Sequence, residues 1–184
     1  SNENDNVDVN SYIPISSAEE LKNILPNCNY ILENDIDLSS FEWTPLPAFT
    51  GVFNGNNKTI SGLTIISNNS HQNSIGLFSS INGSVFDLTL ENVTITLSDF
   101  IEDYKIGALA GLVETNSTNP ASIRNVTVES GNITAQTATF VGGVVGYSLN
   151  SELQNLTNKA TISGFTNVGG ICGFACTSTT AYKL

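Results

Sequence analysis

The chain of 184 residues carries few positive charges and no methionine. Six Lys and Arg residues stand against 17 Asp and Glu residues, which gives a formal net charge of −11. This excess of carboxylates excludes a nucleic-acid groove and an anionic membrane surface as natural partners, because both ligands are themselves densely negative. The sequence also contains no apolar run of about 18 residues, so we expect no membrane insertion in this segment.

Residues that ligate transition metals are scarce too. His71 is the single histidine and lies in a polar stretch, so no second histidine is present to complete a site. Cys28, Cys172 and Cys176 give an odd cysteine count, and the last two have no matching second pair. We therefore predict no metal site and no cofactor, and we expect Cys172 to be a small core residue.

Asparagine, serine and threonine are abundant, a composition typical of disorder. The hydrophobic fraction of 40% is too high for a disordered chain, so the polar residues must be distributed periodically. The period is visible in two interleaved templates. The first reads apolar, any residue, Asp/Asn/Gly, apolar, Thr, and occupies residues 60–65, 85–90, 123–128 and 153–158. The second is rich in glycine and occupies residues 75–78, 106–111, 141–146 and 168–173.

The two templates alternate four times, which predicts a stacked repeat architecture. Each template supplies strands too short to be stable alone, so each strand must pair in parallel with its counterpart in the next copy. We therefore predict an all-β fold, a right-handed parallel β-helix (solenoid) of about four coils with an apolar lumen. The structural repeat glycines are Gly76, Gly107, Gly111, Gly142, Gly143, Gly146, Gly169, Gly170 and Gly173. A structural column of turn residues is formed by Asp87, Asn125 and Asn155.

Three parts follow one another along the sequence. Residues 1–12 are polar and acidic and predict a flexible N-terminal arm. Residues 13–48 predict an N-terminal cap made of a short helix and an entry strand, because the open end of a stack of strands needs covering. Residues 49–184 carry the repeats, which we expect to continue beyond Leu184 because no charged or helical cap follows the last copy.

The capping helix is predicted over residues 16–25. Ser16 or Ser17 supplies the N-cap, and a glutamate three residues further on completes a capping box. The apolar residues of this stretch fall on one face, and Pro26 ends the helix.

These residues resemble the GLUG-motif proteins, which are secreted or surface-attached right-handed β-helices. Residues 32–38 and 43–46 look like the entry segment of that family, and residues 49–65 are similar to its first coil. The motif that names the family is matched by residues 106–111, 141–146 and 168–173, whereas residues 75–79 are a degenerate copy. The resemblance implies an extracellular scaffold or adhesion module. Related segments occur in large adhesins and in bacterial peptidases that cleave immunoglobulin A. In the peptidases they lie outside the catalytic domain.

β-helices also include polysaccharide lyases and hydrolases, which need converging carboxylates or a base. Asp35 and Asp37 share one face of a strand, where they would hold Ca²⁺, form an acid/base pair, or bond to turn amides of the cap. The last alternative is favoured. Arg124 is the single arginine and occupies a variable repeat position, which favours a solvent-facing side chain. We predict no catalytic residue. If the source is eukaryotic, Asn68 and Asn116 are the plausible N-glycosylation sites.

The sequence therefore predicts a non-enzymatic extracellular or cell-surface β-helix module that acts as a stalk or as an adhesion scaffold. Its expected partner is a host or cell-surface protein or glycan. Two alternatives remain open. One is a carbohydrate-active β-helix, a polysaccharide lyase or hydrolase, which would need three or more carboxylates and an aromatic platform on one face. The other is an accessory segment of a large secreted peptidase.

Overall fold

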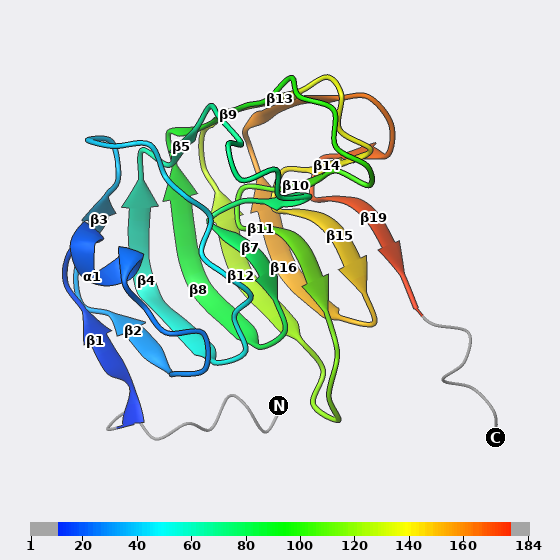
Figure 1. The fold of residues 1–184 in the computed structure, drawn as a ribbon. Coiled ribbons are helices and arrows are strands. Elements are labelled where there is room, and N and C mark those ends of the chain that lie inside the picture. The colour runs from blue at the N-terminus through cyan, green and yellow to red at the C-terminus, as the bar shows by residue number, and fades with distance from the viewer. Residues whose placement is uncertain (1–10, 178–184) are drawn as a thin grey trace, which may run out of the picture.

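The computed structural model describes residues 11–177, which form many short strands and a single short helix (Figure 1). The longest sheet, which we call the first sheet, has seven strands. Five of them pair in the order β2-β4-β8-β12-β16, β1 flanks β2, and β3 pairs with β4. Their bounds are β1 (Ile13–Ile15), β2 (Tyr30–Leu32), β3 (Ile36–Asp37), β4 (Val52–Ser61), β8 (Ser84–Glu91), β12 (Ser122–Val128) and β16 (Glu152–Asn158).

Three further sheets have four strands each, and every strand pairs with its counterpart one repeat away. The second sheet contains β5 (Thr64–Ile65), β9 (Val93–Thr96), β13 (Gly131–Ala135) and β17 (Thr161–Gly164). The third sheet contains β6 (Ser74–Ile75), β10 (Lys105–Ile106), β14 (Phe140–Gly142) and β18 (Val168–Gly169). The fourth sheet contains β7 (Phe78–Ile81), β11 (Ala110–Glu114), β15 (Val145–Leu149) and β19 (Cys172–Cys176).

All pairings between these strands are parallel, and their register places equivalent residues of the repeats side by side. In the first sheet Ile123 pairs with Val85 on one side and with Leu153 on the other. In the fourth sheet Val145 lies between Ala110 and Cys172, the alignment expected from the glycine-rich template. An all-β class built of parallel sheets is thus confirmed, and the arrangement is consistent with the predicted β-helix.

The inward-facing residues of the four sheets form one continuous apolar core. Its N-terminal end is filled by aromatic rings: the centroid of Phe78 lies 5.2 Å from that of Phe49 and 5.7 Å from that of Phe53. Further along, the core is lined by aliphatic residues such as Ile106 and Val141, both of which are fully buried. Burial of these columns supplies the main driving force for a chain whose individual strands are very short.

The N-terminal helix, α1 (Ala18–Lys22), is shorter than the predicted span of 16–25. Ser17 is its N-cap and accepts a hydrogen bond of 3.2 Å from the backbone N–H of Glu20. The helix ends at Asn23, and the following backbone N–H of Leu25 donates to the Tyr30 hydroxyl at 2.7 Å instead of continuing the helix. A tertiary hydrogen bond therefore replaces the last predicted turn. None of the helices among residues 11–177 is long and apolar enough to span a membrane.

The repeat glycines stand where the backbone is too crowded for a side chain. A Cβ atom at Gly146 would lie 2.6 Å from the backbone nitrogen of Ile106, and one at Gly111 would lie 2.6 Å from the carbonyl oxygen of Lys105. The same crowding by backbone atoms holds for the other predicted repeat glycines except Gly170, which has open space. Gly143, its counterpart one repeat earlier, is crowded by the Gly170 carbonyl. The glycines thus permit close approach of neighbouring chain segments.

Most of the predicted arm, residues 1–12, lies outside the described residues. Tyr12 is described and is buried against Val52 and Phe86, on the side of the first sheet away from the main core.

Candidate binding face

The outward-facing positions of the fourth sheet change character along the stack. Ser80, Leu112, Tyr147 and Phe174 occupy equivalent positions in β7, β11, β15 and β19 and pair in register. The column is thus polar in the first repeat and aromatic in the last two. Because the fold tolerates serine at this position, the two rings are not required by the architecture.

Phe140 of the neighbouring third sheet completes an aromatic cluster with these two residues. The centroids of Tyr147 and Phe174 are 5.3 Å apart in a stacked arrangement, and Phe140 meets the Tyr147 ring edge-on at 4.9 Å. These separations are those of favourable aromatic pairs. All three rings keep exposed surface, and Phe174 is 41% exposed.

Lys105 lies beside the cluster. Its Nζ atom is 5.9 Å from the ring centroids of both Phe140 and Tyr147, within the range of a cation–π interaction. The same atom donates a hydrogen bond of 2.9 Å to the carbonyl oxygen of Asp103. Lys105 pairs with Phe140 in the ladder of the third sheet, so its position is fixed by strand register.

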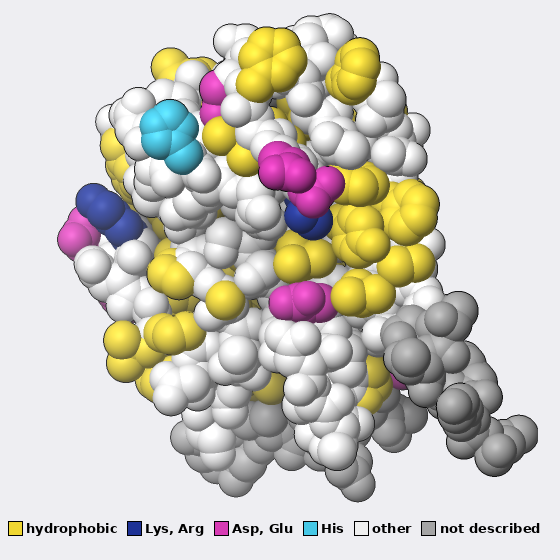
Figure 2. All heavy atoms as spheres, turned by 45° about the vertical axis from the view of Figure 1, so that its right-hand side comes forward, with side chains coloured by type: hydrophobic (Ala, Val, Ile, Leu, Met, Phe, Trp, Pro, Cys, Tyr) yellow, Lys and Arg dark blue, Asp and Glu magenta, His cyan; other side chains and the backbone are white. Residues whose placement is uncertain are grey.

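A hollow of about 360 Å³ lies over these residues. Figure 2 shows this face, where a hydrophobic patch is bordered by acidic side chains and a basic one. The hollow is lined by Asp103, Lys105, Leu112, Glu114, Phe140, Tyr147 and Leu149. It combines apolar ring surface with two carboxylates and one ammonium group, the mixture found in sites that orient small polar ligands.

The hydroxyl of Tyr147 contacts a residue of the next repeat. It lies 3.3 Å from the Cys176 sulfur, which belongs to the next repeat. This hydrogen bond, with a smaller contribution from burial, raises the pKa of Tyr147 above its ordinary value. The hydroxyl is protonated at neutral pH with or without this shift, so the ring is an uncharged surface.

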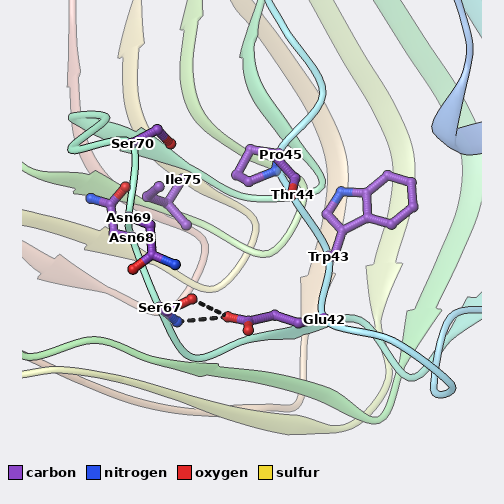
Figure 3. Close-up of a pocket in the computed structure, with 9 residues that line it drawn as sticks. All are labelled: Glu42, Trp43, Thr44, Pro45, Ser67, Asn68, Asn69, Ser70 and Ile75. Atoms are coloured by element: carbon purple, nitrogen blue, oxygen red, sulfur yellow. Dashed lines mark hydrogen bonds between the residues drawn. The ribbon is translucent and has the colours of Figure 1, made fainter.

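A second hollow, of about 180 Å³, lies beside Glu42 and Trp43 (Figure 3). The Glu42 carboxylate accepts hydrogen bonds from the Ser67 hydroxyl and from the backbone N–H groups of Ser67 and Ile66, at 2.7 to 2.9 Å. These bonds, the Ser67 hydroxyl first, lower the pKa of Glu42. The Trp43 indole donates to the Leu77 carbonyl at 2.9 Å and is buried. These hydrogen bonds fasten the loop at Ser67 to the segment that carries Glu42. Because the polar groups already have partners within the chain, the hollow offers little to a ligand.

The predicted Asp/Asn column forms a ladder of side chains. Asn155 donates to Asn125 at 2.7 Å, and Asn125 donates to Asp87 at 2.9 Å. All three residues have positive φ angles, between 52° and 55°, which Asn and Asp tolerate better than other side chains. The ladder links the equivalent bends of three repeats. Because these side chains bond to one another, we assign them a structural role.

The remaining candidates from the sequence each have partners within the chain. The Asp37 carboxylate accepts from the Ser39 N–H within the cap, whereas the Asp35 carboxylate accepts from the N–H of Thr59 in β4 of the first repeat. Arg124 is half-buried, with its guanidinium carbon 4.3 Å from the centroid of the Phe86 ring.

The three cysteines are all half-buried and form no disulfide. Burial raises the pKa of the Cys172 thiol. Among residues 11–177, no group of three or more His, Cys, Asp and Glu side chains could hold a metal ion.

The two glycosylation candidates differ in environment. The Asn68 amide is half-buried and donates to the Tyr104 hydroxyl at 2.9 Å and to the Asp99 carboxylate at 3.2 Å. A glycan on this nitrogen would disrupt that network. Asn116 is exposed, and its side-chain amide donates to Glu114 at 3.1 Å, so its position suits an acceptor better.

The aromatic face is the feature that the sequence interpretation missed. A signal for it was present, because Tyr147 and Phe174 each directly follow the last glycine of a template copy. The equivalent residue of the second copy is Leu112. Phe140 directly precedes the third copy of the template, and its pairing with Lys105 in the third sheet fixes its position.

No protein family matches the sequence, and no solved structure matches it. A stretch of 94 residues is 36% identical to halomucin of Haloquadratum walsbyi. The match covers 45% of this chain and 1% of halomucin, so the chain spans a very small part of that protein.

Proposed function

We propose that this chain is a segment of a right-handed parallel β-helix of the GLUG-motif kind and that it serves as a non-enzymatic binding or adhesion module. One observation carries the proposal. The inward columns are apolar in every repeat, whereas the outward column of the fourth sheet runs from Ser80 through Leu112 to Tyr147 and Phe174. Variation confined to the outside is what a repetitive scaffold uses to present a binding surface.

The proposed location is outside the cell or on its surface. The partial similarity to halomucin supports this location, because mucins are surface proteins. The proposed partner is a glycan or protein of a host or of another cell surface. An exposed aromatic cluster with a polar rim is typical of interaction sites.

The carbohydrate-active alternative gains one observation. Asp103 and Glu114 both line the hollow beside the rings, and glycosidases use a pair of carboxylates. Two carboxylates in the lining fall short of the three that we required for this alternative. A binding module therefore remains the preferred function.

Binding of the fluorescently labelled chain to intact cells and to an immobilised glycan array tests the proposal. We expect saturable binding that is unchanged on prolonged incubation, with no new reducing ends or unsaturated products released from polysaccharides. Turnover that is abolished in Glu114→Gln would establish the enzyme instead. An absence of binding on all cells and glycans would contradict the module.

A further inference from the structure

We infer that the hollow formed by Phe140, Tyr147, Lys105 and the two flanking carboxylates is a subsite for an uncharged sugar ring. This inference rests on the proposed binding function and specifies its ligand. It follows from the ring surface, from the polar rim and from the local charge.

The ring surface suits the apolar face of a pyranose. Sugar rings present C–H groups on one face, and these groups pack on the electron-rich faces of aromatic side chains. Tyr147 and Phe174 stack 5.3 Å apart, and Phe140 stands edge-on to Tyr147, so the three rings form one continuous surface. The hydroxyl of Tyr147 is bonded to Cys176, and the half-buried ring keeps some exposed surface beside the hollow.

The polar rim suits hydroxyl groups, which both donate and accept hydrogen bonds. Asp103 and Glu114 supply acceptors, and Lys105 has further protons on a nitrogen that already donates to the Asp103 carbonyl. A purely apolar ligand such as an acyl chain would desolvate these charged groups without pairing them, which is costly. A ligand with one apolar face and a hydroxylated edge meets both requirements.

The local charge selects an uncharged sugar over an acidic one. Two carboxylates line the hollow against one ammonium group, and the whole chain carries a formal charge of −11. A uronate or sulfate group would be repelled by Asp103 and Glu114. Lys105 is already placed over two ring faces, where it stabilises the cluster, so it does not offset both carboxylates.

The test uses the full chain and a panel of immobilised neutral, amino, uronic-acid and sulfated oligosaccharides, with affinities measured by biolayer interferometry. We expect binding to neutral pyranose glycans, at least about tenfold weaker in Tyr147→Ala and in Phe140→Ala, the two aromatic residues that line the hollow. Phe165→Ala is the matched control. Phe165 is 72% exposed and does not line the hollow, so its removal should leave the affinity unchanged. Equal melting temperatures of the variants show that the fold is retained.

The outcomes separate this inference from the proposed function. If the chain binds cells or glycans and Tyr147→Ala binds equally well, the module stands and the subsite is refuted. Preference for uronic-acid or sulfated glycans refutes it as well. Concentration-dependent dimerisation that Tyr147→Ala abolishes, measured by analytical ultracentrifugation without any glycan binding, would assign the face to a second copy of the chain instead.

Discussion

The third repeat, β12 to β15, and the fourth repeat, β16 to β19, follow the same templates but bury their apolar residues to different extents. Ile123 and Val126 in β12 are inaccessible to solvent, whereas their partners Leu153 and Leu156 in β16 are half-buried. The reason is pairing: β12 lies between β8 and β16, while β16 pairs only with β12 among the described residues. Burial in this fold therefore comes from a neighbouring repeat on each side, as in other repeat proteins.

The largest expected difference in stability is between apolar residues of β12 and their partners in β16. We expect Ile123→Ala to lower the free energy of unfolding by about 2–5 kcal/mol, because it leaves a cavity between two repeats. Leu153→Ala, the matched change one repeat later, should cost clearly less because its site is open on one side. Urea denaturation followed by circular dichroism measures both values. Equal losses would mean that the fourth repeat is as well packed as the third.

Gly143 and Gly170 are equivalent glycines that test the same comparison of the third and fourth repeats. A Cβ at Gly143 collides with the Gly170 carbonyl and the Asn158 side chain, whereas a Cβ at Gly170 meets nothing within 4 Å. Gly143→Ala should therefore destabilise the chain by about 1–3 kcal/mol through overpacking. Gly170→Ala should stay within about 0.5 kcal/mol of the parent chain. A loss at Gly170 as large as that at Gly143 would show that another segment packs over the fourth repeat.

The ladder of turn residues gives a smaller effect. Asn125 bonds to residues of both neighbouring repeats, whereas Asn155 donates to Asn125. Both have φ angles near 50°, so the backbone cost of alanine is the same at the two positions. Asn125→Ala should exceed Asn155→Ala by the value of one hydrogen bond, about 0.5–1.5 kcal/mol. Thermal denaturation compares the two variants, and a larger loss in Asn155→Ala would refute the ladder as drawn.

The smallest effect lies far from both repeats, at Glu42. Hydrogen bonds lower the pKa of its carboxyl in the folded chain, so the stability that the charge contributes is present above the unfolded pKa and disappears as the pH falls through the folded pKa. Glu42→Gln should lower the melting temperature slightly at pH 7, and the difference from the parent chain should vanish in acid. A difference that grows in acid would give the opposite sign and contradict the assignment.

Much of the fold could be predicted from the sequence because its order is periodic. Apolar residues and glycines recur in the same order in each repeat. Parallel stacking then places equivalent residues in columns, such as the column of Ala110, Val145 and Cys172. The end of α1 could not be predicted, because the Tyr30 hydroxyl that accepts the hydrogen bond of the Leu25 N–H belongs to a later strand.

The aromatic face was missed for a related reason. Periodicity describes what the repeats share, whereas Phe140, Lys105 and Tyr147 mark where they differ. Their contacts depend on the turn between the third and fourth sheets and on the pairing of β10 with β14. The hydrogen bond from the Asn68 amide to the Tyr104 hydroxyl likewise joins two residues that do not occupy equivalent positions of the repeats.

Amide hydrogen exchange, measured residue by residue by NMR, tests the stacking of repeats most directly. In a parallel sheet successive amides point to opposite neighbours, so a strand with two partners protects its amides on both sides. We predict slow exchange throughout β12, between β8 and β16, and slow exchange of only alternate amides in β16. Uniform protection along β16, or rapid exchange in β12, would contradict the account.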